Sequence, residues 1–293
     1  MSEWTLGIIG GSGLYNIEGL ENEQWIQIDT PWGSPSDDIL FAEMNGIKLR
    51  FLPRHGRGHA LSPSDLNYRA NIDAMKRAGC TDIVSLSAVG SLKGAYAPGH
   101  FVMVDQFIDR TFKREKSFFG KGLVAHVSVA DPICARLSKM AGEAAMRAGA
   151  TVHWGGTYLT MEGPQFSTKA ESHIYRSWGC DVIGMTNMPE AKLAREAEIP
   201  YATVAMVTDY DCWHDAHGSV DVASVIAVLT KNAAKASGTV KALIEALALE
   251  DRTPSPPGIE TNLDYALITA PEARDPARIA KLDAVAGRVL NPK

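Results

Sequence analysis

The chain has 293 residues, of which 45% are hydrophobic and 22% charged, as in an ordinary globular protein. Its net charge of −5 gives no global positive field for nucleic acid or an anionic membrane, so an anionic ligand needs a local cluster of donors. The N-terminus has no signal-peptide pattern and no apolar run approaches the ~20 residues of a membrane span, so we expect a soluble cytoplasmic protein.

Short strand-like runs alternate with helical patterns along the chain. Asn45-Gly46 predicts a hairpin turn, and Thr168 with Glu171 predicts a capping box at a helix start. The predicted strands are Thr5–Ile9, Ile39–Met44, Ile47–Leu52, Asp82–Ser87, Phe101–Val104, Tyr158–Met161, Val182–Met185 and Tyr201–Val207. The predicted helices are Ser62–Ala78, Asp131–Gly149, one opening at Thr168, Glu190–Ala197 and Val220–Leu247.

This order predicts an α/β fold, a single domain with a central mixed sheet flanked by helices. We expect the main domain over residues 1–250. The segment Arg252–Pro257, rich in Pro and Ser, opens a C-terminal extension over residues 251–293 that packs on the same domain.

Donor-rich loops follow the first and third predicted strands. Gly10-Gly11-Ser12-Gly13 allows close backbone approach to an anion, although a tight turn explains it equally well and it matches no dinucleotide or P-loop pattern. The run Arg54 to His59 holds two Arg and two His, which suit phosphate; the alternative is a solvated basic turn. Metal binding is disfavoured there, because no Cys or acidic ligand is near.

Small hydroxyl residues close two further strands. Ser87-Ala88 ends one and Met185-Thr186 ends the other. Ser and Thr close many strands, so each pair alone carries little weight. Because ligands of open α/β sheets bind beyond the carboxyl ends of the strands, these groups together predict a phosphate cradle.

Two carboxylates, Asp209 and Asp211, follow the apolar strand Tyr201–Val207. One residue apart in an extended segment, they would point the same way, and their proximity and burial would raise at least one pKa. A protonated Asp can donate to N7 of adenine and an ionised one can accept from its 6-amino group. A surface turn or a metal site is the alternative.

Several segments together resemble the 5'-methylthioadenosine phosphorylases of the purine nucleoside phosphorylase superfamily. The resemblance covers roughly residues 5 to 250 and is specific in its motifs. The matching segments are Gly7–Leu14, Pro53–His59, Asn67–Ile72, Asp105–Thr111, Met161–Ser167, Ala170–Ser172, Asp181–Thr186 and Ala205–Trp213.

The resemblance implies a nucleoside phosphorylase-like fold and a set of site residues. The implied phosphate-binding residues are Ser12, Arg54, His55, Ser87, Ala88 and Thr186, and the implied base-binding residues are Phe166, Met185, Asp209, Tyr210 and Asp211. Ser167 stands where 6-oxopurine phosphorylases carry Glu, which favours a 6-aminopurine. Val222 and Val225 resemble residues that face a methylthio group, although core packing explains most apolar residues on that helix.

The implied activity is that of a pentosyltransferase. Phosphate would split 5'-methylthioadenosine into adenine and 5-methylthioribose-1-phosphate, with Asp209 as general acid and Asp211 beside it, in purine and methionine salvage. No metal or organic cofactor is expected, since phosphate is a co-substrate. A 6-oxopurine phosphorylase acting on methylthioinosine or inosine, a hydrolytic nucleosidase and a non-catalytic nucleoside sensor are the alternatives.

The resemblance also implies a homotrimer with its site near the subunit interface. His126 would then reach a neighbour's substrate; otherwise it is a surface histidine. Nucleic acid and membrane are not expected partners.

Overall fold

The computed structural model describes residues 3–11, 17–214 and 222–291. Within these ranges one mixed sheet of 11 strands has the order β2-β3-β4-β1-β5-β10-β9-β7, while β11 pairs with β5 and β6, and β8 with β6. The strands are β1 (Thr5–Gly10), β2 (Glu21–Ile26), β3 (Ile39–Met44), β4 (Ile47–Pro53), β5 (Asp82–Ser91), β6 (Phe101–Met103), β7 (Gln106–Asp109), β8 (Val152–Trp154), β9 (Thr157–Thr160), β10 (Val182–Gly184) and β11 (Tyr201–Asp209).

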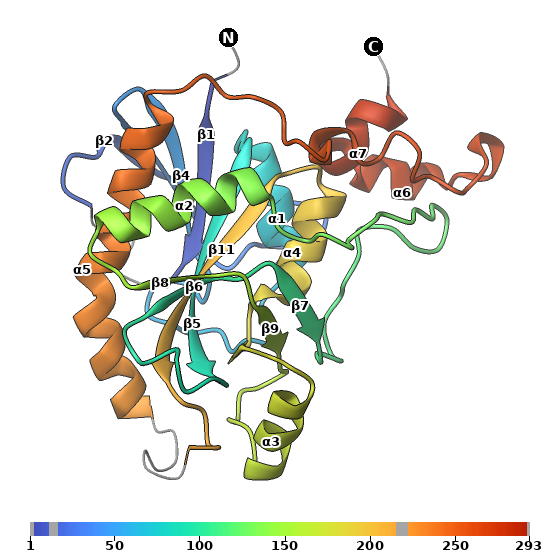
Figure 1. Cartoon of the computed structure of the whole chain (residues 1–293). Helices are drawn as coiled ribbons and strands as arrows, with labels where there is room; N and C mark the ends of the chain where they lie inside the picture. The colour runs from blue at the N-terminus through green and yellow to red at the C-terminus, as the bar shows by residue number, and fades with distance from the viewer. Residues whose placement is uncertain (1–2, 12–16, 215–221, 292–293) are drawn as a thin grey trace.

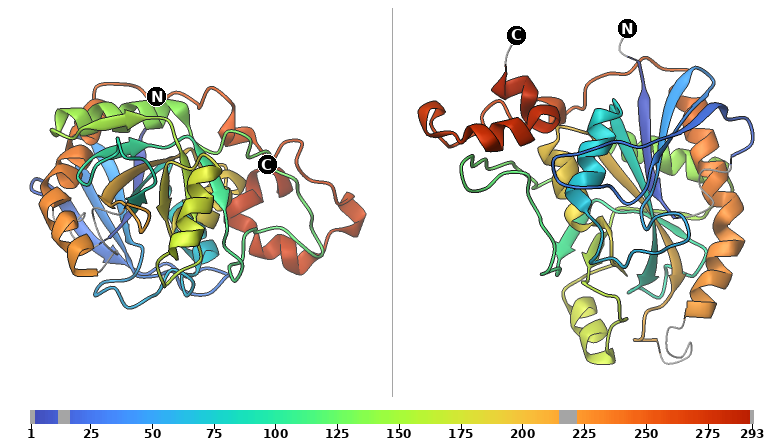
Figure 2. Two further views of the ribbon diagram at one scale, coloured as in Figure 1. Left: turned by 60° about the horizontal axis from the view of Figure 1, so that its bottom comes forward. Right: turned by 180° about the vertical axis from the view of Figure 1, so that it is seen from behind.

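Helices cover both faces of this sheet. Figure 1 shows α2 crossing in front of the strands beside α5, and Figure 2, seen from behind, shows α1 on the opposite side. Helix α2 packs on α5 and β11, whereas α1 packs on α4. The helices are α1 (Tyr68–Arg77), α2 (Ala135–Arg147), α3 (Lys169–Ser177), α4 (Asn187–Glu196), α5 (Val222–Leu247), α6 (Pro276–Lys281) and α7 (Asp283–Leu290), with short 3-10 turns η1 (Ile259–Thr261) and η2 (Pro271–Ala273).

The centre of the sheet is parallel and its core strands are buried. Strand β1 pairs in parallel with β4 and β5, and β11 pairs in parallel with β5. Strand β10 runs antiparallel to the last part of β5, with Ile183 opposite Gly90. The ends of β1, β4, β10 and β11 therefore meet along the second half of β5. The predicted single-domain mixed α/β fold is confirmed.

Local sequence signals set several element boundaries. Asn45 and Gly46 both have positive φ, 51° and 77°, which the tight turn between β3 and β4 requires. The Thr168 hydroxyl accepts from the Glu171 backbone N–H at 3.2 Å, and the Glu171 carboxylate accepts from the Thr168 N–H at 2.8 Å. The predicted hairpin and capping box are thus both present.

Other predicted boundaries are wrong. Helix α1 begins at Tyr68, capped by Asn67, rather than at Ser62, because Ser62 hydrogen-bonds Asp65 in a turn ahead of the helix. Helix α2 likewise begins at Ala135 rather than Asp131. Strand β2 was not predicted, because its sequence is largely polar and exposed and its pairing comes from β3.

The C-terminal segment after α5 packs on the main body through ion pairs and apolar contacts. Arg252 binds the buried Asp82 at 2.6 Å, and Arg288 binds Glu198 at 2.6 Å. Leu282 joins the central core and α7 packs on α1. Figure 1 shows α6 and α7 projecting to one side with the loop before α2, where Ala125 bridges Leu267.

A partly buried carboxylate, Glu196 at the end of α4, holds that same loop and predicts a pH-dependent stability. Glu196 accepts hydrogen bonds from the Ser117 hydroxyl and the Phe118 N–H, both at 2.7 Å. Burial raises the pKa of Glu196 to about 7, above its unfolded value of 4.5. The folded state therefore retains a proton that the unfolded state releases, so stability falls as pH rises from 4.5 through about 7.

Glu196→Gln should keep an acceptor for these donors and remove the cost of ionisation. We expect it to stabilise the protein at pH 8 by roughly 2 kcal/mol and to change little at pH 5. Thermal unfolding of both proteins at the two pH values measures this. An equal effect at both pH values would contradict it, and Glu245→Gln on α5 serves as the control.

Candidate active site

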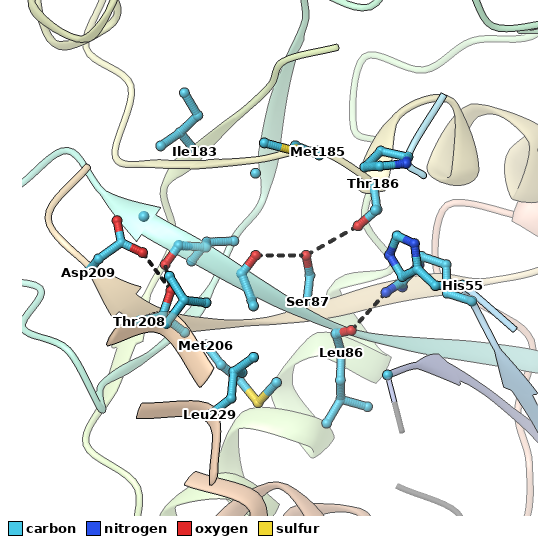
Figure 3. A pocket seen from close by; sticks show the side chains of 18 of the residues that line it. His55, Leu86, Ser87, Ile183, Met185, Thr186, Met206, Thr208, Asp209 and Leu229 are labelled. Carbon is cyan, nitrogen blue, oxygen red and sulfur yellow. Dashed lines mark hydrogen bonds between the residues drawn. The ribbon is translucent and has the colours of Figure 1, made fainter. Parts of the chain in front are cut away.

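A cavity of about 360 Å³ opens where the strand ends meet. Its lining comes from the ends of β1, β4, β10 and β11, from the middle of β5 and from one face of α5. Figure 3 shows Asp209 and Thr208 at one end, His55 and Thr186 at the other, and Ser87 between them. The sequence thus correctly indicated that the strand ends converge on one hollow.

Arg54 lines the cavity, but its guanidinium is largely used by the protein itself. Its Nε and Nη2 donate to the two carboxylate oxygens of Glu190 at 2.9 and 3.1 Å, and Nη1 donates to the Leu86 carbonyl at 3.0 Å. Burial opposes the charged form, yet Glu190 more than offsets this and holds the pKa of Arg54 above its ordinary value. The positive charge of Arg54 is therefore neutralised by Glu190. One of its two Nη1 hydrogens makes no hydrogen bond among the described contacts.

His55 beside it is held as a neutral imidazole. Its Nδ1 lies 2.9 Å from the Leu61 carbonyl, which can only accept, so Nδ1 carries the hydrogen. Burial has the largest effect on the pKa of His55 and the nearby charge of Arg54 the second largest; together they lower it to about 4. Its ring stacks on His59 at 4.3 Å. The free Nε2 is thus an acceptor at neutral pH and suits a protonated oxygen of phosphate or a sugar hydroxyl.

Hydroxyl and backbone donors complete this end of the cavity. Ser87, Ala88 and Thr186 all line it, and the Ser87 and Thr186 hydroxyl oxygens lie 3.4 Å apart. Gly11 lines it from the end of β1. Ser12, a predicted phosphate-binding residue, lies outside the described residues.

The two carboxylates meet at the opposite end. The Asp209 Oδ1 accepts from the Asp211 N–H at 2.8 Å, and Asp209 Oδ2 lies 2.7 Å from the Thr208 hydroxyl. Burial raises the pKa of both residues, and for Asp211 the charge of Asp209 adds to it. Asp211 is 5% exposed and lines the cavity; its Oδ2 makes no hydrogen bond of ordinary geometry within the described chain, although the Ser172 and Ser167 hydroxyls interact with the carboxyl and act to lower its pKa.

The convergence of these carboxylates has a different cause from the predicted one. Strand β11 ends at Asp209, and Asp211 has a φ of +49° in a left-handed turn rather than an extended segment. Gly90 on β5 makes room for the turn, since a Cβ there would lie 2.8 Å from Asp209 Oδ1. A backbone reversal, not strand alternation, brings the pair together.

The Thr208 hydroxyl is placed to accommodate either protonation state of Asp209. It lies 2.7 Å from Asp209 Oδ2 and 3.2 Å from the Val89 carbonyl oxygen. When Asp209 is ionised, Thr208 can donate to it; when Asp209 is protonated, Thr208 can donate to Val89 instead. The site thus tolerates a neutral Asp209 without leaving a buried hydroxyl unpaired.

Apolar side chains form the walls between these two ends. Three of the lining residues, Phe166, Met185 and Val225, were predicted from the sequence. Met206 and Leu229 also line the cavity. Val222 is 62% exposed and is not among the lining residues. Of the two predicted specificity valines, the structure therefore brings only Val225 to the cavity.

Three other predicted residues are not among those that line the cavity: Tyr210 and Ser167 lie close to the carboxylates, and His126 lies on the projecting loop. The Tyr210 hydroxyl donates to the Gly94 carbonyl at 3.3 Å, and its ring stands edge-on to Trp213. Ser167 accepts from the Cys212 thiol through its carbonyl at 3.2 Å, next to the carboxylates. His126 is exposed on the projecting loop, where its N–H donates to Ala266 at 2.9 Å.

Sequence reasoning missed the residues that hold the site from behind. Glu190 is the clearest, because it binds Arg54 from 136 positions away and also accepts from the Tyr201 hydroxyl at 2.7 Å. Thr208, which directly precedes the carboxylates in the sequence, was not predicted to have a role either. An acidic residue inside an otherwise buried helix such as α4 is the one signal that could have indicated Glu190.

The described residues contain no group of three potential metal ligands. Among the helices that the structure describes, none combines the length and apolar character needed to cross a membrane.

Comparisons with known proteins agree with this geometry. The family model described as the phosphorylase superfamily matches residues 5–245. S-methyl-5'-thioadenosine phosphorylase of Cereibacter sphaeroides is 63% identical, over 97% of this chain and 98% of the relative. The corresponding protein of Rhodospirillum rubrum is 60% identical, over 98% and 97%.

The chain is also similar to solved structures of methylthioadenosine phosphorylases. Methylthioadenosine phosphorylase from an antarctic soil metagenomic library superimposes with a TM-score of 0.91 at 47% identity, covering 97% of this chain and 99% of that one. Methylthioadenosine phosphorylase from Schistosoma mansoni, in complex with adenine, gives a TM-score of 0.80 at 35% identity, covering 89% and 96%.

Proposed function

The chain belongs to the phosphorylase superfamily, and on that premise we propose that it catalyses the phosphorolysis of 5'-methylthioadenosine. The products are adenine and 5-methylthioribose-1-phosphate, which makes the protein a pentosyltransferase. One observation carries the proposal: one cavity has two carboxylates at one end, Asp211 buried and Asp209 half-buried, and a compensated Arg among hydroxyls at the other. Relatives of this name at 60–63% identity support the choice of substrate.

The carboxylate end suits a 6-aminopurine. Asp211 Oδ2 is a buried acceptor that makes no hydrogen bond of ordinary geometry within the described chain, and it can receive the 6-amino group. Asp209, whose pKa burial raises, can donate a proton to N7. A 6-oxopurine would require a donor opposite O6, so the pair argues against that alternative.

The other end suits inorganic phosphate. Ser87, Thr186 and the remaining Arg54 hydrogen donate to its oxygens, while the neutral His55 Nε2 accepts from its hydroxyl. We propose that Ser12 and the Ala88 N–H complete this site. A hydrolytic nucleosidase has no need of such a cradle.

Charge development then accounts for the reaction. As the C–N bond breaks, the ribose becomes oxocarbenium-like and the base gains electrons, which protonation by Asp209 stabilises. Phosphate aligned on the other face of the ribose offsets the positive charge and then bonds to C1'. We propose that this requires no metal and no organic cofactor.

Incubating the protein with 5'-methylthioadenosine, with and without phosphate, tests the proposal. We expect adenine release only with phosphate, together with 5-methylthioribose-1-phosphate. Phosphate-independent release would instead show a nucleosidase, and a preference for methylthioinosine a 6-oxopurine enzyme. Binding without turnover would show a nucleoside sensor.

The apolar wall predicts the preference at the 5' position. Val225→Thr keeps the side-chain shape and adds a hydroxyl to a wall that would face the methylthio group. We expect the ratio of kcat/KM for methylthioadenosine over adenosine to fall roughly tenfold. Val222→Thr is the comparison: being 62% exposed, it should change the ratio less, and the reverse order would contradict the assignment.

Four further expectations belong to the same proposal. We propose that the protein works in the cytoplasm, in purine and methionine salvage, as a homotrimer. The exposed His126 on the projecting loop would then reach a neighbour's substrate. Sedimentation analysis, and the effect of His126→Ala on the nucleoside KM, test the last two.

A further inference from the structure

A tyrosine behind the cavity holds the hydroxyls of the proposed phosphate site. Tyr158 lies on β9, is fully buried, and is not among the residues that line the cavity. Its phenolic oxygen is 3.1 Å from the Ser87 Oγ, which is itself 3.4 Å from the Thr186 Oγ1. Tyr158 thus contacts Ser87 from the protein interior, whereas the cavity lies on the opposite side of Ser87.

The hydrogen on the Tyr158 oxygen has a defined direction. The main chain of Thr186 also hydrogen-bonds this oxygen, and a backbone N–H can only donate. The phenolic oxygen therefore accepts from the Thr186 N–H, and its own hydrogen is left for the hydroxyl oxygens of Ser87 and Thr186. Ser87 Oγ lies 3.1 Å away and is a suitable acceptor, since a phenol donates more readily than an alcohol. Ser87 then accepts from behind and keeps its own hydrogen for the cavity.

The fold makes specific room for this hydroxyl. Gly184 on β10 faces it so closely that a Cβ at that position would lie 1.9 Å from the Tyr158 oxygen and 2.6 Å from its Cζ. A side chain on Gly184 would expel the phenol from its place between Ser87 and Thr186. The glycine and the tyrosine thus form one packed unit next to the Met185-Thr186 turn.

We propose that Tyr158 is a positioning residue that directs the Ser87 hydroxyl hydrogen towards phosphate. This inference rests on the proposed phosphate site. The Ser87 hydroxyl already lies 3.4 Å from the Ala88 carbonyl, a long contact to which it can donate. Without the phenolic donor, nothing opposes this contact, and Ser87 then presents a lone pair to the anion. Tyr158 contributes to phosphate binding without touching phosphate.

Tyr158→Phe tests this by removing one oxygen atom. We expect the KM for phosphate to rise roughly five- to tenfold, as for loss of one well-aimed hydrogen bond to a charged group, with the KM for the nucleoside within twofold of wild type. Tyr175→Phe, which removes a phenolic oxygen from a buried site outside the cavity lining, should change neither KM.

A double-mutant cycle with Ser87→Ala separates positioning from a general structural effect. If Tyr158 acts through Ser87, the double variant should bind phosphate no more weakly than Ser87→Ala alone. An unchanged phosphate KM in Tyr158→Phe, an equal rise in both KM values, or additive losses in the cycle would overturn the inference. The wild-type reaction without phosphate is the separate check: turnover there refutes the proposed function itself.

Discussion

Replacing Asp209 by Asn will lower kcat roughly 10²- to 10³-fold, the usual cost of losing a general acid aimed at the leaving group. An amide at this position can still hydrogen-bond N7 but cannot transfer a proton to it. Because the proposed phosphate site lies at the opposite end of the cavity from Asp209, the KM for phosphate should stay within about threefold. Steady-state kinetics with each substrate varied in turn measures both values.

The pH profile of the wild-type enzyme provides an independent check on the same residue. The acid acts in its protonated form, so kcat should fall as pH rises through the Asp209 pKa, which burial raises above 3.8. Asp211→Asn is the matched control, since it alters the neighbouring carboxylate and should chiefly raise the nucleoside KM. Should Asp211→Asn rather than Asp209→Asn abolish turnover, the two roles are exchanged.

Motifs at strand ends made the cavity predictable from the sequence. Arg54 and Asp209 lie at the ends of β4 and β11, which belong to the parallel part of the sheet, and parallel pairing carries such ends to one edge. Ser87 instead lies inside β5, which extends beyond its predicted end, and Thr186 follows β10, which runs antiparallel to β5. Burial of a strand can be judged from its own residues, which is why β5 and β11 were found. Strand β2 was missed because its stability depends on its neighbour rather than on its own polar sequence.

What the sequence could not predict is how those residues are supported. Nothing local links Arg54 to Glu190, or Tyr158 to Gly184, since each contact depends on strand order and register. The left-handed turn at Asp211 is equally hidden, because Asp adopts positive φ only where the surrounding structure imposes it. Sequence motifs identified most of the polar groups that line the cavity, and tertiary structure determined their charge and hydrogen-bond partners.

Removing Glu190 should be among the most destabilising single changes in the chain. Its carboxylate is 1% exposed and makes two hydrogen bonds to the Arg54 guanidinium, which is 3% exposed. Glu190→Ala leaves the Arg54 cation buried without a counter-charge. We expect the free energy of unfolding to fall by roughly 3–5 kcal/mol. Urea unfolding followed by tryptophan fluorescence measures the loss, and Glu245→Ala on α5 is the control.

A double variant distinguishes the structural role of Arg54 from its role in phosphate binding. Arg54→Met combined with Glu190→Met removes both charges, so it should lose less stability than the sum of the two single changes. Its phosphate KM should nevertheless stay at least tenfold above wild type, roughly, because the Nη1 donor is gone. Recovery of stability together with normal phosphate binding would mean that Arg54 serves only the fold. The opposite result is a double variant that regains stability but still binds phosphate weakly. It would establish that the buried Arg54 charge is not needed for the fold and is kept for the one hydrogen that it can donate to phosphate.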